Sequence, residues 1–236
     1  SAIYVQGQVD RLNITGNDFY IQRELEQNKS FQCIGFAYTN DRLTQNVTIE
    51  NNKVKDDHTG KGTAYFIIGG VNVEQGKDPV NVPDGYSIEN LQVTGNELTS
   101  SSSFYGMWLS NVNGLKVTGN TFDCAVGVGL TNDANPNAKP TTNVTIQGNS
   151  GTTKNVLFLY GAEPLSDEPV YLTDVEANKI QLYDDKKDST NDAKANFAVV
   201  GFDPNGGTCQ YMSAVAKKNG HITVPTATRT DYTFLG

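Results

Sequence analysis

Histidine, tryptophan and cysteine are scarce in this chain of 236 residues, which contains two, one and three of them. A zinc site needs cysteines and histidines at short, regular spacings, and no cluster of these residues has such a spacing. The sequence therefore predicts no metal centre of this type, and none of its motifs predicts a cofactor.

Basic residues are too few to favour an anionic partner. Lysine and arginine total 18 against 26 aspartates and glutamates, which gives a formal net charge of −8 at pH 7. Nucleic acids and anionic membrane surfaces both attract basic faces, so we expect neither as a partner.

Long apolar runs are missing as well, since no stretch approaches the ~20 residues that span a membrane. The chain shows no signal peptide, and it starts at Ser1 with no initiator methionine. We therefore expect it to be a processed product or a piece cut from a longer protein.

What the chain does contain is a short repeated phrase. It reads LQVTGNEL at Leu91–Leu98 and LKVTGNTF at Leu115–Phe122, with a second apolar segment, Tyr105–Leu109, between the two copies. Alternating apolar and polar residues place one set of side chains on one face of a β-strand. Glycine followed by asparagine favours a bend, because both tolerate the left-handed backbone region. A strand, a bend, a second strand and another bend form one coil of a solenoid.

The phrase recurs at Leu12–Phe19, Val47–Val54, Val144–Gly151 and, in a weaker form, Thr173–Ile180. A β-branched residue lies three positions before the asparagine of every copy. The aligned asparagines are Asn17, Asn52, Asn96, Asn120, Asn149 and Asn178. We expect all six to stack in one line and to hydrogen-bond from coil to coil through their side-chain amides.

The spacing of the asparagines sets the size of a coil. The shortest interval, from Asn96 to Asn120, is 24 residues. That length suits three short strands with tight turns, whereas a helical repeat needs more residues and a 3.6-residue period. The sequence therefore predicts an all-β solenoid of about six coils over residues 1–182 and a polar connector over 183–195. The small C-terminal β region over 196–236 is either a cap or the start of an oligomerisation region.

The cysteines fit this arrangement as free thiols. Cys33 and Cys124 open corresponding strands three coils apart, which is about 14 Å at the spacing of β-strands. A disulfide requires Cα atoms within roughly 7 Å. We therefore predict buried free thiols.

The repeat resembles that of right-handed parallel β-helix proteins, the pectate-lyase-like superfamily, over about Ile3–Leu182. This resemblance implies a right-handed, single-stranded parallel β-helix. Pectin-degrading enzymes, alginate epimerases and phage tailspikes share the scaffold, so the repeat is specific for fold and not for function. The carboxylate clusters of polygalacturonases, the Asp-Pro-His pattern of the epimerases and the basic motifs of the lyases are missing. The pattern as a whole is most similar to that of phage tailspikes.

The segments between the repeats, such as Tyr105–Ser110 and Asn155–Tyr160, are apolar on both faces. One set of side chains fills the interior, and the other set points outward and includes aromatic residues. The outward set fits a platform for sugar rings, an oligomer interface, or burial under long loops. If it is a platform, Trp108, Tyr160 and Asn111 are the predicted ligand contacts.

Two acidic residues are candidates for catalysis. Hydrolysis of a glycosidic bond needs two carboxyl groups, about 5–5.5 Å apart for retention or about 6.5–9.5 Å for inversion. Asp133 and Glu163 each follow an apolar segment by three residues, on neighbouring coils. We predict them as the catalytic pair, with ordinary solvated loop acids as the alternative. Asp56-Asp57-His58, with His58 as a base, is a second candidate, and a solvated turn is its alternative.

These features predict a protein that binds a cell-surface polysaccharide, with depolymerisation left open. The ligand would lie in a groove along the helix axis, walled by the loops Gly69–Ser87, Thr131–Thr142 and Gly161–Pro169. The resemblance to tailspikes implies a homotrimer on a virion surface or in the extracellular space. The alternatives are a secreted bacterial carbohydrate-active or adhesin module and a purely structural β-helical fibre segment.

Overall fold

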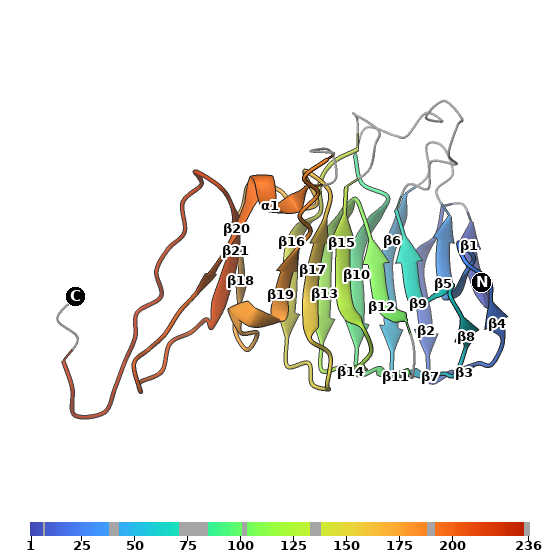
Figure 1. Ribbon diagram of the computed structural model, residues 1–236, viewed down its shortest axis with the longest axis horizontal. Helices are drawn as coiled ribbons and strands as arrows, with labels where there is room; N and C mark the ends of the chain where they lie inside the picture. The colour runs from blue at the N-terminus through green and yellow to red at the C-terminus, as the bar shows by residue number, and fades with distance from the viewer. Residues whose placement is uncertain are drawn as a thin grey trace.

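The computed structural model describes residues 1–6, 8–37, 43–70, 85–100, 103–132, 138–187 and 192–233. Its strands form three parallel sheets along the length of the molecule, and the chain winds through them as a parallel β-helix (Figure 1). The N-terminal coils lie at one end of the stack, and a small antiparallel sheet lies beyond the last coil (Figure 1). The predicted all-β parallel β-helix of about six coils, with a small C-terminal β region, is confirmed.

The chain visits the three sheets in a fixed order. Sheet B comes first in a coil and contains β2 (Asp10–Thr15), β6 (Thr44–Glu50), β10 (Ile88–Thr94), β13 (Val112–Thr118) and β16 (Thr142–Gln147). Sheet C follows with β3 (Asp18–Ile21), β7 (Lys53–Asp56), β11 (Glu97–Ser100) and β14 (Thr121–Asp123). Sheet A closes the coil with β1 (Ile3–Gln6), β5 (Ser30–Ala37), β9 (Thr63–Gly69), β12 (Phe104–Leu109), β15 (Val126–Thr131), β17 (Asn155–Tyr160) and β19 (Ile180–Leu182). Two short strands, β4 (Glu24–Leu25) and β8 (Thr59–Gly60), pair between sheets C and A.

The repeated phrase determines which side chains fill the tube. In sheet B, Leu91 lies in register between Val47 and Leu115, and all three side chains have 0% exposure. The β-branched column two residues further on is buried in the same way. Burial of each such side chain contributes about 1.5–3 kcal/mol. The alternation read from the sequence is therefore the alternation of inside and outside.

Five of the six aligned asparagines form a hydrogen-bonded ladder at the bend between sheets B and C. The backbone N–H and Nδ2 of each donate to Oδ1 of the next at 2.9–3.0 Å, in the order Asn17, Asn52, Asn96, Asn120 and Asn149. From Asn52 onward, each Nδ2 also donates to a carbonyl of the preceding coil, as Asn96 does to Ile49 O at 3.0 Å. The three inner amides, Asn52, Asn96 and Asn120, join neighbouring coils and have their polar atoms paired inside the protein, which is why they can be buried.

The weaker copy of the repeat does not extend the ladder, contrary to the prediction for Asn178. In the five good copies, the residue before the asparagine is glycine or asparagine with a left-handed φ of 54–66°. In the sixth it is Ala177, whose Cβ disfavours that conformation. The chain instead forms a 3₁₀ helix, η1 (Ala177–Lys179), and Asn178 is exposed on it. Asp174 accepts the hydrogen bond of the Gly148 N–H at this end of the stack.

The C-terminal sheet is antiparallel and contains β18 (Val170–Leu172), β21 (Ser213–Lys217) and β20 (Phe197–Gly201). Its strand β18 precedes the last solenoid strand β19 in the chain, so the two regions are interleaved. A short helix, α1 (Ala193–Asn196), leads into β20. After β21 the chain runs outward from the stack (Figure 1). In the ranges that the structure describes, no helix has the length and apolar character needed to cross a membrane.

Candidate ligand-binding face

In β9 and β12 of sheet A, the outward side chains are spaced three residues apart, not two. In β12, Tyr105 and Trp108 are partly exposed, whereas Gly106 and Met107 between them are buried. In the pairing with β15, Tyr105 lies opposite Val126 and Met107 lies opposite Val128, so Gly106 is skipped. Strand β9 likewise has two consecutive buried residues in its middle, Phe66 and Ile67. Strict alternation would place Tyr105 and Trp108 on opposite faces of the sheet. The buried pair in mid-strand therefore brings both rings to the outer face.

Six aromatic rings form one continuous cluster on this outer face. We call it the aromatic line, and its members are Tyr65, Tyr105, Trp108, Phe158, Tyr160 and Tyr183. The centroids of contacting rings are 4.6–6.5 Å apart, and their planes are tilted by 33–89°. Tilted and edge-to-face contacts are the favoured geometries for aromatic pairs. The line is therefore a packed unit before any ligand binds.

A glycine makes the aromatic line continuous across β15. Gly129 lies in register between Trp108 of β12 and Phe158 of β17. A Cβ at this position would lie 2.4 Å from Cε3 and 2.9 Å from Cζ3 of Trp108. The indole thus lies directly on the backbone of β15, where any larger residue would push it away. Gly129 is a positioning residue for Trp108.

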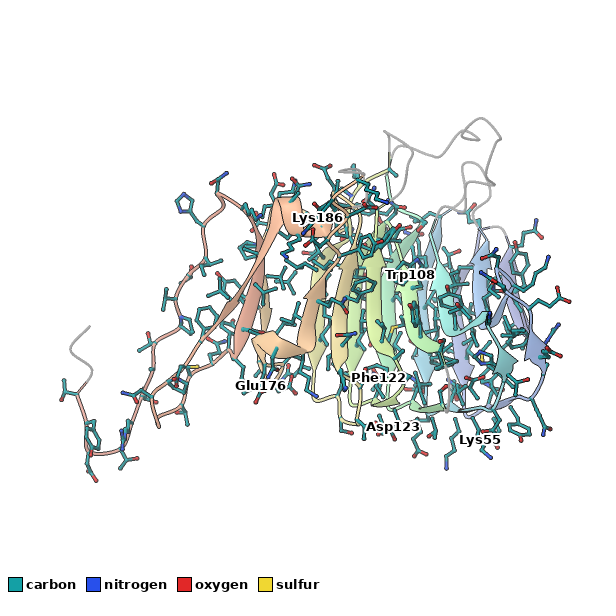
Figure 2. The ribbon with its side chains drawn as sticks, in the orientation of Figure 1. Lys55, Trp108, Phe122, Asp123, Glu176 and Lys186 are labelled. Atoms are coloured by element: carbon teal, nitrogen blue, oxygen red, sulfur yellow. The ribbon has the colours of Figure 1, made fainter. Side chains whose placement is uncertain are left out.

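The aromatic line is half-buried and disfavours charge. Phe158 is 8% exposed, and the other five rings are partly exposed. Burial raises the pKa of Tyr65, and the nearby Tyr105 adds to this shift. Two of the three predicted ligand contacts, Trp108 and Tyr160, belong to the line, with ring centroids 5.7 Å apart. Figure 2 shows Trp108 on the sheet A side of the stack.

Asn111, the third predicted contact, does not lie on this face. It follows β12 at the bend toward sheet B, where it is 2% exposed and has a left-handed φ of 55°. Its Nδ2 donates to Lys139 O at 2.7 Å, and its Oδ1 has no hydrogen-bond partner among the described residues. Because its side chain is buried in the bend, a ligand on the aromatic line does not reach it.

Of the predicted catalytic pair, only Glu163 is described, because Asp133 lies outside the described residues. Its partner Glu163 is exposed, and its Oε1 lies 3.4 Å from Nζ of Lys217. The same Nζ lies 2.6 Å from Oδ1 of Asp167, so one ammonium holds two carboxylates. The pairing of Asp133 with Glu163 stays a prediction. Most of Gly69–Ser87 and part of Thr131–Thr142, two of the three predicted groove walls, also lie outside the described residues.

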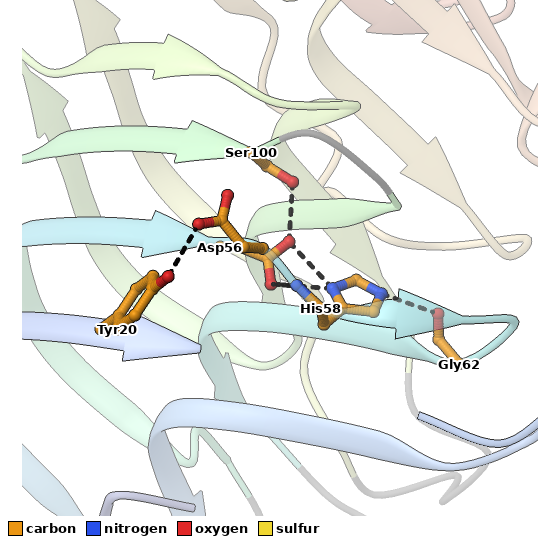
Figure 3. A network of polar contacts seen from close by, with 6 residues as sticks. Tyr20, Asp56, His58, Gly62 and Ser100 are labelled. Carbon is orange, nitrogen blue, oxygen red and sulfur yellow. Dashed lines mark hydrogen bonds and ion pairs between the residues drawn. The ribbon is translucent and has the colours of Figure 1, made fainter. Parts of the chain in front are cut away.

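The Asp56-Asp57-His58 segment is not a solvated turn, because the first and third residues are buried and contact each other in a network of polar contacts (Figure 3). Nδ1 of His58 lies 2.8 and 2.9 Å from the two carboxylate oxygens of Asp56, and Nε2 lies 3.3 Å from Gly62 O. Ser100, one coil further on, donates to Asp56 Oδ2 at 2.7 Å. Both ring nitrogens thus face acceptors within the fold. His58 therefore fixes the connection between sheets C and A, and a role as a catalytic base is not supported.

Sequence reasoning missed Tyr65, Tyr105 and Gly129 as parts of the site. The missing signal was the position of the buried pair in mid-strand, which reverses the alternation of inward and outward residues. A glycine in the middle of the apolar segment Ala125–Leu130 marks close backbone approach, and that was the available clue to Gly129.

Among the described residues, no group of three histidine, cysteine, aspartate or glutamate side chains is placed to hold a metal ion. Comparisons of the chain with protein-family models, with curated proteins and with solved structures found no match.

Proposed function

We propose that this chain binds a polysaccharide along the outer face of sheet A. The aromatic line is the observation that supports this proposal. Its rings extend from β9 to the residue after β19, across four strand spacings of about 4.8 Å, or ~19 Å in all. The apolar faces of pyranose rings stack on aromatic side chains, and a line of this length suits a chain of sugars better than a single one.

The broader assignment follows from the sequence resemblance. A tailspike-like β-helical module would present this face to a cell-surface polysaccharide, on a virion or in the extracellular space. Depolymerisation by Asp133 and Glu163 is the catalytic extension of the proposal. An adhesin or other carbohydrate-active module from a bacterium would use the same face for binding alone.

The binding proposal has a direct spectroscopic test, because Trp108 is the only tryptophan in the chain. Titration with soluble polysaccharides should change its fluorescence, and affinity gel electrophoresis should show retarded migration in the gel that contains the ligand. Trp108→Ala should lose the retardation, whereas Tyr20→Ala should keep it, because Tyr20 is 57% exposed on sheet C. Equal retardation of the Trp108→Ala variant would contradict the proposed site.

Cleavage has a separate test. The chain should release new reducing ends from the polysaccharide, and Glu163→Gln should abolish this release.

Self-association is a second proposal, and the C-terminal segment favours it. Val224 and Tyr232 are 72% and 67% exposed, in a stretch after β21 that carries no helix or strand within its described part. Large apolar side chains exposed on an extended segment are suited to a partner chain. We propose that this segment packs against other copies in a homotrimer. Light scattering should show a trimer for the full chain and smaller species for the Val224→Asp/Tyr232→Asp variant, and a monomeric parent chain would contradict it.

A further inference from the structure

The strands of sheet A carry no charge. Not one residue of β1, β5, β9, β12, β15, β17 or β19 is an aspartate, glutamate, lysine, arginine or histidine. The other two parallel sheets differ, since sheet B includes Asp10, Arg11, Glu50, Glu89 and Lys116, and sheet C includes Asp18, Lys53, Lys55, Asp56, Glu97 and Asp123. The absence of charge is therefore a property of the face that bears the aromatic line.

The charged residues around sheet A lie beyond its strand ends. Next to Tyr183, Asp184 accepts a hydrogen bond from Lys194 at 2.9 Å, and Lys186 and Lys187 follow, exposed, in the same segment. Lys217 is held by the carboxylates described above. Lys194 and Lys217 are thus neutralised by carboxylates, and the exposed Lys186 and Lys187 lie at one end of the aromatic line, not along it.

We propose that the polysaccharide held on the aromatic line is a neutral glycan, one without uronate, sialate, sulfate or phosphate groups. This inference rests on the proposed function and narrows its ligand class. It differs from the sequence-based expectation, which left the sugar unspecified.

Desolvation disfavours an anionic ligand on this face. An anionic polymer carries a charge on every one or two sugars, and laying it on a half-buried ring surface would remove water from those charges. A carboxylate can leave water at acceptable cost only when a cation or several N–H donors replace it. The strands of sheet A provide no cation. A neutral sugar loses only hydroxyl hydration, which uncharged side chains can replace.

Such side chains accompany the rings on the same outer columns. Gln32 is paired in register with Tyr65, and Gln181 with Phe158. Thr131 is paired with Tyr160, and Asn155 begins β17 beside Val126. All four are partly or fully exposed. Amides and hydroxyls both donate and accept hydrogen bonds, which matches the hydroxyl groups of a neutral glycan without selecting a charge.

The test compares two panels of soluble polysaccharides on the full chain. The neutral panel is a β-glucan, a galactomannan and fully methyl-esterified polygalacturonate. The acidic panel is alginate, hyaluronan and unesterified polygalacturonate. The two polygalacturonates form a matched pair, because they share a backbone and differ in charge. Binding is followed by Trp108 fluorescence and by affinity electrophoresis at low and at high salt.

We expect at least one neutral polymer to shift the Trp108 emission, with an affinity that salt does not change, because no ion pair forms. Trp108→Ala should weaken that binding about tenfold or more, as expected for a central aromatic contact. Tyr20→Ala, on sheet C, should leave it unchanged.

Each of the other possible outcomes contradicts the neutral-ligand inference, the proposed site or the proposed function. Salt-sensitive binding of acidic polymers at Trp108, with none of neutral ones, overturns the neutral-ligand inference and leaves the proposed function standing. Binding that persists in Trp108→Ala overturns the site. No binding in either panel overturns both, and a self-associated chain with Trp108 shielded would then assign the face to a second copy of the protein.

Discussion

The outer faces of sheets A and C belong to the same coils, but the strands of sheet A carry no charged residues, whereas those of sheet C carry both acidic and basic ones. On the outer face of sheet A, burial raises the pKa of Tyr65, which favours its neutral form. Burial likewise raises the pKa of Cys33, in the core beneath this sheet, and of Cys124, in the connection that leads into β15. On sheet C, Lys55 and Tyr20 lower the pKa of Asp57, and Asp57 raises the pKa of Lys55, so both ions are favoured. Figure 2 shows Lys55 and Asp123 on the sheet C side of the stack and Trp108 on the sheet A side.

The difference between the two faces shows which side chains the fold requires and which positions can vary. A parallel β-helix needs apolar columns inside and hydrogen-bonded bends, and both sheets satisfy these needs in the same way. It places no demand on outward side chains, so these can be charged for solubility or aromatic for binding. Where a solenoid face departs from the charged pattern, a ligand or partner is the physical reason to look for.

The largest expected effect is a difference in reactivity among the three cysteine thiols. Burial raises the pKa of Cys33 and of Cys124 to about 12, so their thiolate population near neutral pH is roughly 1000-fold below that of an ordinary thiol. Iodoacetamide should therefore modify Cys33, which is buried, only after unfolding, and Cys124, which is partly exposed but has a raised pKa, far more slowly than an ordinary thiol. Cys209, which is also partly exposed, is the comparison within the native protein. Peptide mass spectrometry at increasing urea would measure this, and rapid native alkylation of Cys33 would contradict it.

The same thiols predict a loss of stability in alkali. Their folded pKa of about 12 lies above the ordinary value of 9.0, so the folded state holds these protons more tightly. The resulting stabilisation is fully present below about pH 9 and is lost as the pH rises toward about 12. We expect a decrease on the order of a few kcal/mol for each thiol across this window, seen as falling urea midpoints. Cys33→Ala should flatten the pH dependence, and a midpoint that rises with pH would contradict the prediction.

The asparagine ladder tests the interior that both faces share. Asn120→Ala would leave the N–H and Nδ2 of Asn96 without their acceptor and Val93 O without its donor. Each unsatisfied buried group costs about 1–3 kcal/mol, so the unfolding free energy should fall by about 3 kcal/mol or more. Asn178→Ala is the matched control, because Asn178 is exposed outside the ladder, and urea denaturation should show no change for it. Equal effects of the two substitutions would contradict the ladder.

A substitution at Gly129 tests the outer face of sheet A alone. In Gly129→Ala the new methyl group would displace Trp108, because its Cβ would lie 2.4 Å from the indole. We expect a shifted Trp108 emission, about tenfold weaker polysaccharide binding, and a loss of about 1–3 kcal/mol through overpacking. Gly35→Ala is the control, since Gly35 lies in the same outward column of sheet A but meets the side chains of Ser1 and Tyr4. An unchanged emission in Gly129→Ala would show that Trp108 does not depend on this glycine.

The smallest effect is expected on sheet C. Asp57→Asn would remove the ion pair with Lys55 at 2.9 Å and the carboxylate that accepts from Tyr20 at 3.0 Å. Because water screens these exposed groups, the urea midpoint should not change measurably. The pKa of Tyr20, which Asp57 raises, should fall toward its ordinary value in a spectroscopic titration. A clear drop in the midpoint would mean that the charged face stabilises the fold after all.

The sequence predicted the fold because one phrase encodes both the alternation and the bend. Leu91, Val93 and Asn96 each recur at fixed offsets in neighbouring coils, and each column lies where the offsets place it. The prediction for Asn178 was wrong because the alignment considered the asparagine and not the residue before it. Ala177 cannot readily adopt the left-handed conformation that the bend requires.

The site was only partly predictable, because it depends on relations between coils. Trp108 and Tyr160 were identified from strands apolar on both faces, but their contact depends on Gly129 in the strand between them. His58 was misjudged because its neighbours in sequence are charged. Its burial comes from stacking against a coil whose Ser100 lies 44 residues from Asp56, and no local pattern reports that distance.

The asparagine ladder also gives the stack a direction. At every step the donor belongs to the N-terminal coil and the acceptor to the C-terminal one, from Asn17 through to Asn149. The amide dipoles are therefore aligned along the axis, and each bond polarises the next. The two ends of the column differ in chemistry, much as the two ends of an α-helix do. Any coil that continued the line before Asn17 would have to offer an N–H to its Oδ1, so the column can be extended head to tail and never head to head.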